Sequence, residues 1–573
     1  MRLLPLLFVL ACAADKDGAS TDTGTDTGPD TDTDTDTDTD TDTDTDTDTD
    51  TDTDSGDEDL AAVVEEALSA GLARDLRRNE ASGASVAVWI DGQIIAFGYG
   101  DRHPDAGGAV GTDTLFQIGS DTKKLTALAV LQQVQRGALS LDDTLSAALP
   151  ELVFATDPSL SDQITVRMLL SHQSGIFDYT PWDDAPSDDE LADRAYGEFA
   201  AREWMMGAPG LYWNYSNPGF STLGLVAQEA DGRPYVDILE QDLFEPLGMT
   251  RSFGRLSEVA ADGDYATGTG IAFLEGASRW DIWSEDFDYT WGTLEMEDQV
   301  DNGFTRPAGL VWSTATDMVK LAKFLVDGDE DVIDTSLLRE LETAAVPLYP
   351  TIPGQSYAYG LMILDGFNLG SDYYAQPLWV HGGNTLTQTS TFYVLPEARF
   401  AISILSNGYA DSWDNTLKAA LLLADLGEPS EGASFPEPTD LASYEGTWVD
   451  HLLGEISLTY DGSDLNISIP TMDALGFTVR ADLDPVAQDI FYVYLDGQAY
   501  DITFIDGEDG TPHKYLRNRS FVGVRDGDLS AVRPAPPTVG EVSGLLAFAS
   551  LQDPLRAVRP LLPGPIGDRA RAE

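Results

Sequence analysis

The residues of this sequence best suited to chemistry are Ser120 and Lys123. Residues 116–125 read Phe-Gln-Ile-Gly-Ser-Asp-Thr-Lys-Lys-Leu. Positions i and i+3 lie on the same face of a helix, so the hydroxyl and the amine would point the same way. A serine with an amine beside it has the parts of an activated nucleophile. The simpler alternative is a serine that caps a helix and a lysine that is solvated, because Ser-x-x-Lys also occurs by chance.

A helix must hold this pair in place. Apolar residues recur after it at three-residue spacing, which predicts a helical stripe: Leu125, Leu128, Leu131 and Val134. Gly137 stands where such a helix should end. Ser120 would then lie at a helix N-terminus, where free N–H groups and the helix dipole favour negative charge. We expect Lys124 to point away from this face and to be solvated.

Two later stretches supply possible partners for Ser120. Residues 213–219 read Trp-Asn-Tyr-Ser-Asn-Pro-Gly, a turn-forming sequence that includes Tyr215 and Asn217. Residues 380–384 read Val-His-Gly-Gly-Asn and precede a predicted strand.

Taken in order, these three motifs resemble those of the serine β-lactamase and penicillin-binding-protein-like superfamily, which includes class C β-lactamases, D-Ala-D-Ala carboxypeptidases and esterase relatives. Ser-x-x-Lys is the first motif and Tyr-x-Asn the second, and His-x-Gly stands where other members have Lys-Thr-Gly. Secondary matches follow in the family's order: residues 169–175, 245–249, 307–309 and 313–318. The resemblance covers about residues 63–427.

The resemblance implies a role for each polar residue. Ser120 would be the nucleophile that forms an acyl-enzyme. Lys123 could take its proton only when neutral, and burial or a nearby cation lowers a lysine pKa. Tyr215 would lie in the same cluster as a phenolate or a proton shuttle, and which of Lys123 and Tyr215 is the base stays open. Asn217 would orient either the substrate amide or Lys123.

The third motif would complete the site from the edge of a strand. The oxyanion hole would consist of the backbone N–H groups of Ser120 and Asn384. Gly382 and Gly383 would let this backbone approach the substrate closely. His381 would either complete the catalytic hydrogen-bond network or be an interior histidine that only packs.

Differences from the family pattern concern the substrate. His381 replaces a lysine cation, and Gly382 replaces the threonine hydroxyl that binds the β-lactam carboxylate. Residues 384–388 read Asn-Thr-Leu-Thr-Gln, where the family usually has Gly-Thr-Pro-Gly-Phe. We therefore expect hydrolysis of esters, amides or D-aminoacyl peptides, with a true β-lactamase as the alternative. We interpret His172, a position where the family also has histidine, as structural.

The sequence fits other functional classes less well. A catalytically inactive relative could be a cell-surface binding protein, but Ser120, Lys123, Tyr215 and Asn217 are all present. An α/β-hydrolase would need a Gly-x-Ser-x-Gly elbow, which the sequence lacks. A zinc site is not predicted, because there is no His-Glu-x-x-His motif and no cysteine in the globular region. No cofactor is predicted.

Composition narrows the partners. The 573 residues suggest two to four domains, and the net charge of −67 with a pI near 4.1 argues against nucleic acid and anionic membrane surfaces. A single cysteine excludes a disulfide framework. The expected partner is a small-molecule or peptide substrate, and the sequence does not predict the oligomeric state.

The first residues are typical of export. Residues 1–13 predict a secretory signal, with Arg2 before an apolar run. The run ends at Cys12, as in the lipobox of bacterial lipoproteins, where this cysteine would be lipidated; ordinary cleavage at Ala-Cys-Ala is the alternative. Residues 14–59, mostly alternating Thr-Asp, predict a disordered linker. We expect an exported protein, held at a membrane only through the lipid anchor or otherwise secreted or periplasmic.

The globular part is predicted to begin near Leu60. Residues 60–430 would form the hydrolase domain, an α/β (α+β) fold with an antiparallel sheet, flanking helices and a helical insertion. Residues 441–527 alternate in short strands with Asp-Gly turns, which predicts an antiparallel β barrel or sandwich. Residues 528–573 form a Pro-rich tail with one possible helix, which we expect to be loosely ordered.

Local patterns within the hydrolase domain predict individual elements. Asp91-Gly92 is the turn of a predicted hairpin over 84–99. Periodicity predicts further elements as follows: helices at 60–78 and 314–326, mainly helices from 139 to 240, a loop at 296–309, and strands at 357–364 and 389–407.

Overall fold

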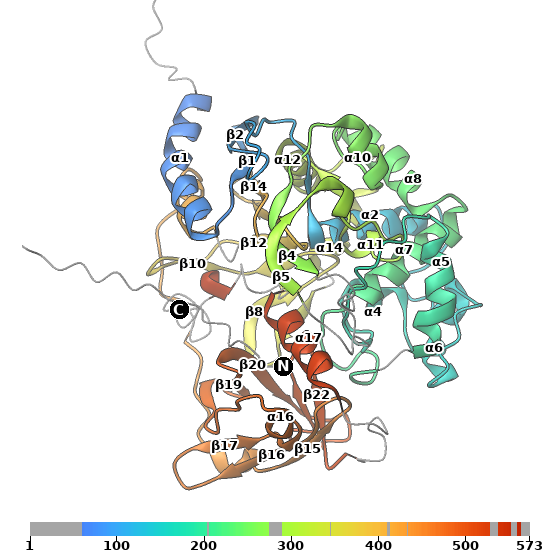
Figure 1. Ribbon diagram of the computed structural model, residues 1–573, viewed down its shortest axis with the longest axis vertical. Coiled ribbons are helices and arrows are strands. Elements are labelled where there is room, and N and C mark those ends of the chain that lie inside the picture. The colour runs from blue at the N-terminus through green and yellow to red at the C-terminus, as the bar shows by residue number, and fades with distance from the viewer. Residues whose placement is uncertain are drawn as a thin grey trace, which may run out of the picture. The chain divides into compact units, whose positions relative to one another are not determined.

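The computed structural model describes the globular part of the chain (Figure 1). The described residues are 60–202, 205–273, 289–343, 345–409, 413–432, 434–527, 537–551 and 559–562. The predicted signal with Cys12 and the predicted linker lie outside the described residues. Within the described ranges, no helix is long and apolar enough to cross a membrane.

The region predicted to be the hydrolase domain is built around an eight-stranded antiparallel sheet in the order β2-β1-β14-β13-β12-β9-β8-β7. Its strands are β1 (Gly83–Ile90), β2 (Gln93–Gly100), β7 (Val346–Tyr349), β8 (Ile352–Tyr357), β9 (Met362–Leu364), β12 (Leu378–Asn384), β13 (Thr389–Leu395) and β14 (Phe400–Ser406). β1 pairs with β14, with Ala84 opposite Ser406, so strands from both ends of the domain lie side by side. The predicted mixed fold with an antiparallel sheet is confirmed.

The first hairpin follows from its turn. Asp91 and Gly92 have φ of 50° and 78°. This left-handed backbone is what a two-residue type I′ turn requires, and Asp-Gly favours it. The predicted hairpin is therefore present. Its first strand, β1, lies between β2 and β14 in the sheet.

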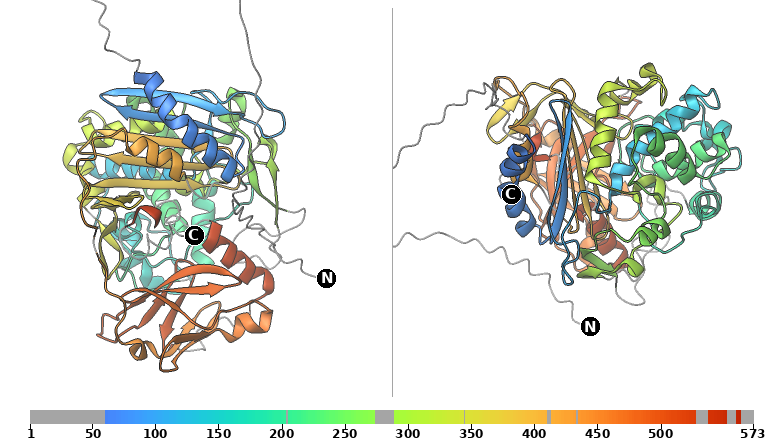
Figure 2. Two further views of the ribbon diagram at one scale, coloured as in Figure 1. Left: turned by 90° about the vertical axis from the view of Figure 1, so that its left-hand side faces the viewer. Right: turned by 90° about the horizontal axis from the view of Figure 1, so that it is seen from above.

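Helices cover both faces of the sheet (Figure 2). They are α1 (Leu60–Arg78) and α15 (Asp414–Leu421) on one face, and α2 (Thr122–Gln135) and α12 (Ala315–Asp327) on the other. Side chains of β1 alternate between the two layers, as successive strand residues do. Val86 and Val88 join the apolar core under α1 and α15, whereas Ala87 and Trp89 join the core around α2 and α12.

Between β2 and β7 the chain forms the predicted helical insertion. Besides α2 and α12, its helices are α3 (Leu145–Ala148), α4 (Val166–Leu170), α5 (Glu190–Arg194), α6 (Ala200–Arg202), α7 (Asn217–Asp231), α8 (Tyr235–Leu239), α9 (Glu245–Leu247), α10 (Leu256–Asp262), α11 (Arg306–Gly309), α13 (Thr335–Leu338) and α14 (Glu340–Thr343). Small ladders join β3 (Phe116–Gln117) to β6 (Trp312–Ser313), β4 (Gly268–Phe273) to β5 (Tyr289–Leu294), and β10 (Phe367–Leu369) to β11 (Asp372–Tyr374).

Three predicted segments differ in the structure. The strand predicted at 389–407 is two strands, β13 and β14, because the chain turns at residues 396–399, where Arg399 has φ of 50°. The strand predicted at 357–364 is divided between β8 and β9, because Gly360 takes a left-handed backbone (φ 77°) in the turn that joins them. The loop predicted at 296–309 ends in helix α11. Pro307 lies in its first turn, where a missing N–H costs no helical hydrogen bond.

The C-terminal β domain is an eight-stranded antiparallel sheet that closes on itself. Its strands are β15 (Gly446–Asp450), β16 (Gly454–Tyr460), β17 (Leu465–Ser468), β18 (Asp484–Ala487), β19 (Ile490–Leu495), β20 (Gln498–Ile505), β21 (Tyr515–Arg517) and β22 (Val522–Arg525). β17 and β18 end the sheet, yet the Ile467 N–H donates to the Ala481 carbonyl (2.6 Å), and the Leu483 N–H donates to the Leu465 carbonyl (2.9 Å). Ala481 and Leu483 lie just before β18, so the two ends of the sheet meet through one antiparallel bridge, between Asn466 and Asp482. This closure favours the predicted barrel over the sandwich.

The predicted tail contains one helix, α17 (Val539–Leu551), as its pattern indicated. Val542 of this helix is fully buried in the apolar core of the β domain. Loose order is therefore the wrong expectation for α17, because its side chains have a core to enter.

Candidate active site

Ser120 lies where a glycine turns the chain into helix α2. Gly119 has φ of 52° and opens a short 3-10 turn that runs directly into the helix. The predicted helix end is also observed, since α2 stops at Gln135 and Gly137 has φ of 70°. Ser120 is half-buried, so the predicted nucleophile stands at a helix start and keeps contact with solvent.

The amine of Lys123 is fully buried and bonds to uncharged groups. Nζ lies 3.1 Å from Ser120 Oγ, 2.7 Å from Asn217 Oδ1 and 2.6 Å from the Ala308 carbonyl oxygen. A neutral amine has two N–H donors and one lone pair. Because Asn217 Oδ1 and the Ala308 carbonyl can only accept, a neutral Lys123 donates to both and directs its lone pair at the Ser120 hydroxyl.

Electrostatics favour this neutral form. Burial lowers the pKa of Lys123 well below its ordinary value. Asp178 and Asp121 oppose this effect, whereas the cations Arg519 and Lys124 add to it. Lys123 is therefore suited to accept a proton from Ser120, as a general base must.

Lys124 is not solvated, and the prediction for it is wrong. Its side chain is fully buried and pairs with Asp121, and Nζ lies 4.1 Å from the centre of the Phe392 ring. Ser390 Oγ donates to the other oxygen of Asp121 (2.5 Å). Every residue of α2 from 122 to 133 is buried, so the helix has no solvated face for Lys124 to occupy.

The second motif is held at the N-terminus of α7. Ser216 caps this helix, because its side chain accepts a backbone N–H at 3.1 Å. Asn217 follows with both ends of its amide engaged: Oδ1 accepts from Lys123, and Nδ2 donates to Thr180 Oγ1 (2.9 Å). The structure shows the contact of Asn217 with Lys123, and its predicted contact with a substrate amide stays a prediction.

Tyr215 is buried beside Lys123, whose Nζ lies 4.8 Å from the centre of its ring. Burial raises the pKa of Tyr215, and the Arg519 cation opposes this rise only in part. Among the described residues, the Tyr215 hydroxyl has no partner at hydrogen-bond geometry. A raised pKa keeps the side chain a phenol at neutral pH, which favours the proton shuttle over the phenolate.

Strand β12 brings the third motif against Ser120. A Cβ atom on Gly119 would lie 2.8 Å from the Asn384 backbone nitrogen, and one on Gly383 would lie 2.6 Å from that of Ser120. Two backbones can approach this closely only at glycines. The backbone N–H groups of Ser120 and Asn384 are thus neighbours, as the predicted oxyanion hole requires. Strand β9 pairs with β12 only as far as Val380, which leaves this part of the edge without a strand neighbour in the described sheet.

His381 is buried next to the cluster, but its ring bonds elsewhere. Nδ1 lies 2.7 Å from the Gly382 carbonyl oxygen, so Nδ1 carries the proton, and Nε2 accepts from the Tyr357 hydroxyl (3.2 Å). Burial, with Lys124 and Lys123 nearby, lowers the pKa of His381 well below its ordinary value. Within the described ranges His381 makes no bond to the nucleophile, and it is a neutral interior histidine rather than a cation.

His172 supports the second motif from behind. Its ring centre lies 4.3 Å from that of Tyr215 and 4.9 Å from that of Phe220. Nδ1 accepts the Ser216 backbone N–H (3.1 Å). These contacts agree with a structural role.

Two charged residues of the cluster escaped prediction. Asp178 is fully buried, and its Oδ1 accepts the Asn217 backbone N–H (2.7 Å). Arg519, in the turn between β21 and β22, donates from Nε to Asp178 Oδ2 (2.6 Å) and lies 4.8 Å from the centre of the Tyr215 ring. Two signals in the sequence could have indicated them. Asp178 follows closely after the matched stretch 169–175, and Arg519 forms a closely spaced pair with Arg517 in a strongly acidic chain.

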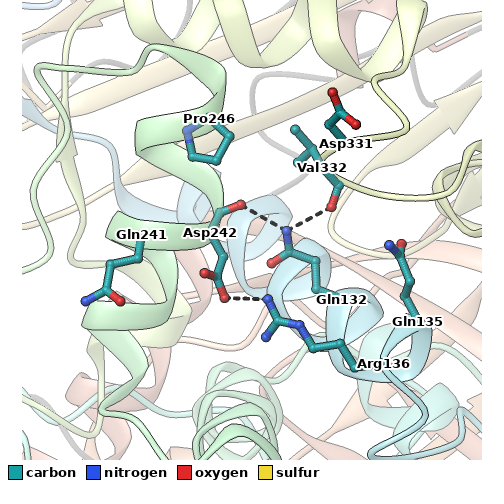
Figure 3. A pocket seen from close by; sticks show the side chains of 8 residues that line it. All are labelled: Gln132, Gln135, Arg136, Gln241, Asp242, Pro246, Asp331 and Val332. Atoms are coloured by element: carbon teal, nitrogen blue, oxygen red, sulfur yellow. Dashed lines mark hydrogen bonds and ion pairs between the residues drawn. The ribbon is translucent and has the colours of Figure 1, made fainter.

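A polar cavity of about 280 Å³ lies at the other end of α2 (Figure 3). It is lined by Gln132, Gln135, Arg136, Gln241, Asp242, Pro246, Asp331 and Val332. At 1.5 Å of rise per residue, Gln132 is about 18 Å along the helix from Ser120. Arg136 is already paired with Asp242, and none of the predicted site residues lines this cavity. The described part of the chain also contains no group of three or more His, Cys, Asp or Glu residues that could hold a metal.

Comparison with known sequences agrees with the motifs. Residues 60–426 match a family model described as Beta-lactamase. Penicillin-binding protein 4 of Amycolatopsis lactamdurans is 30% identical over 380 residues, which are 64% of this chain and 92% of that protein. Protein flp of Staphylococcus aureus is 29% identical over 180 residues, which are 31% of this chain and only 36% of that protein.

Solved structures share the fold. SurE has a TM-score of 0.59 at 23% identity, over 81% of this chain and 99% of its own. The D-amino acid amidase from Ochrobactrum anthropi SV3 has a TM-score of 0.51 at 24% identity, over 63% of this chain and 98% of its own. The family match spans all three motifs around Ser120, and the chain therefore belongs to the Beta-lactamase family of serine hydrolases, whose fold it shares with penicillin-binding proteins.

Proposed function

We propose that this protein hydrolyses short-chain esters, D-amino-acid amides or D-aminoacyl peptides through an acyl-enzyme on Ser120. The observation that carries the proposal is the environment of Lys123. Its buried amine touches the nucleophile and two neutral acceptors, and no carboxylate lies within ion-pair distance among the described residues. Such a lysine can be neutral, and a neutral lysine can take the Ser120 proton.

The steps follow from these contacts. Ser120 Oγ attacks the substrate carbonyl carbon while its proton moves to Lys123 Nζ. The carbonyl oxygen becomes an oxyanion, to which the backbone N–H groups of Ser120 and Asn384 donate. As the bond to the leaving alcohol or amine breaks, the proton passes to that group, with the Tyr215 phenol placed to relay it. Water then attacks the ester carbonyl and gives a proton to Lys123. As the bond to Ser120 Oγ breaks, Lys123 returns that proton to Oγ, and the acid leaves.

The third motif supports the substrate class. A β-lactam carboxylate is held best by a cation and a hydroxyl on this strand, and β12 offers a neutral histidine and Gly382 instead. The net charge of −67 also disfavours anionic substrates at long range. The names of two similar proteins, a penicillin-binding protein and a D-amino acid amidase, keep β-lactams and D-amino-acid amides among the substrates worth testing.

Steady-state kinetics test the proposal. The panel is p-nitrophenyl acetate, D- and L-phenylalanine amide, a D-Ala-D-Ala peptide and nitrocefin, with a fluorophosphonate probe to label activated serine. We expect labelling of Ser120 and a higher kcat/KM for the ester or a D-amide than for nitrocefin. Nitrocefin turnover as fast as that of the ester would instead identify a true β-lactamase. If neither probe nor substrate reacts, the protein is an inactive binding relative.

We also propose that the protein is exported and anchored at a membrane through Cys12. The support is sequence alone: an apolar run that ends at the chain's single cysteine, followed by a long Thr-Asp stretch. Cys12→Ser should move the protein from the membrane fraction to the soluble fraction, and mass spectrometry should find diacylglycerol on Cys12. A mature, unlipidated N-terminus at Ala14 would show that ordinary signal cleavage occurs.

A further inference from the structure

The loop that carries the second motif is in contact with the C-terminal β domain. Arg517, buried on β21, donates to the Trp213 carbonyl oxygen. The Asn214 side chain donates to the Arg519 carbonyl oxygen (3.2 Å). Both partners immediately precede Tyr215, so the turn between β21 and β22 lies directly on the catalytic loop.

The side chain of Arg519 extends this contact into the site. It is 9% exposed and donates through two nitrogens to Asp178, whose side chain is fully buried. Asp178 in turn accepts the backbone N–H of Asn217, and Asn217 binds Lys123. A continuous chain of hydrogen bonds therefore runs from the β domain to the amine of Lys123.

We propose that Arg519 is a positioning residue for the hydrolysis described above, so that the β domain is a working part of the active site rather than a separate binding module. The proposal rests on the proposed acyl-enzyme function. Arg519 fixes Asp178 and through it the start of α7, and it places a positive charge over the Tyr215 ring, 4.8 Å from its centre.

The charge around Lys123 makes this role measurable. The charged and titratable groups that face it are Asp121 and Lys124 at the start of α2, His172 and Asp178 in the segment after α4, Tyr215 before α7, His381 on β12, and Arg519. A cation near a lysine disfavours its protonated form and a carboxylate favours it. Arg519 and Asp178 therefore act on the pKa of Lys123 in opposite directions.

The test is the pH profile of kcat/KM for p-nitrophenyl acetate in full-length variants. Arg519→Met removes the cation, so we expect the acidic limb to move to higher pH by about 1 pH unit. Asp178→Asn removes the carboxylate, so the limb should move to lower pH. The double variant should return close to the wild-type position, and Arg519→Lys should keep the limb in place while kcat falls.

Arg525→Met is the matched control, because Arg525 lies on the neighbouring strand β22 against Trp448, within the β domain. Its limb should not move, and circular dichroism should show that every variant is folded. The proposal would be overturned if the acidic limb of the kcat/KM profile stayed in place, or moved in the same direction, in both single variants. Arg519 would then have only a structural role. A wild-type protein without esterase activity or probe labelling would instead refute the proposed function.

Discussion

Two adjacent lysines of α2 lie in pockets of opposite character. Both are fully buried, but Lys124 is paired with Asp121, and Ser390 donates to the same carboxylate. Lys123 meets Ser120 Oγ, an amide oxygen and a carbonyl oxygen, with no carboxylate at ion-pair distance in the described structure. Two neighbouring residues thus have different environments: Lys124 is in a buried ion pair, and Lys123 is a buried amine without a charged partner at ion-pair distance in the described structure.

The comparison teaches that burial alone does not make a base. Desolvation lowers the pKa of both amines, and for Lys124 the contact with Asp121 opposes this. A buried ion pair has a structural role, because removing either partner leaves an unpaired charge in the protein interior. A buried amine with neutral acceptors is instead ready to change its protonation state. The pockets predict separable effects of substitution.

The largest effect should come from Ser120, the serine that Lys123 contacts. Ser120→Ala should lower kcat by more than about a thousandfold and abolish probe labelling, because covalent catalysis loses its nucleophile. Ser390→Ala is the matched control in the Lys124 pocket, and it should keep kcat within about tenfold. Steady-state kinetics on p-nitrophenyl acetate measure both. Full activity in Ser120→Ala would exclude the acyl-enzyme.

The second largest effect should come from removing the amine of Lys123. Lys123→Met keeps the length of the side chain but has no lone pair for the Ser120 proton, so acylation should slow by at least about a hundredfold. Tyr215→Phe should slow it by a similar factor if the phenol relays the proton. Stopped-flow acylation rates measure both. If both variants acylate normally, Lys123 and Tyr215 are not the proton-transfer groups.

Removing the paired amine should affect stability instead. Lys124→Met leaves Asp121 buried without its cation, which should lower the free energy of unfolding by about 3–5 kcal/mol. Removing both charges in Asp121→Asn with Lys124→Met should recover much of this loss. Urea denaturation measures the change. A destabilisation no larger than that of Lys123→Met would erase the contrast between the pockets.

The smallest effect concerns His381 and pH. Its pKa is lowered by burial, so the ring stays neutral as the pH falls from about 7.5 to about 6 and gains no charge to hold an anion. The ratio of kcat/KM for nitrocefin to that for p-nitrophenyl acetate should therefore stay constant over this range. A ratio that rises as pH falls, and that no longer rises in His381→Gln, would show that His381 binds the carboxylate in its protonated form.

The sequence was sufficient for features that depend on local patterns. Ser120, Lys123 and Asn217 could be paired because spacing on a helix and the order of motifs place them together. The burial of Lys124 could not be predicted, because α2 is enclosed on every side although it carries polar residues such as Lys124 and Gln133. A polar residue in a sequence normally indicates an exposed position. Arg519 was missed because its contact with Asp178 joins residues 341 positions apart, and only the packing of the β domain creates it.

The pairing of β1 with β14 has a consequence for folding while the chain is being synthesised. Ala84 meets Ser406, so the inner edge of the first hairpin must wait for its partner. At a ribosomal rate of 5–20 residues per second, that wait lasts roughly 15 to 60 s. A strand edge left open for this long invites intermolecular pairing. Cellular yield should therefore depend on chaperones that shield this hairpin, and esterase activity should emerge in refolding only after helical circular dichroism has recovered.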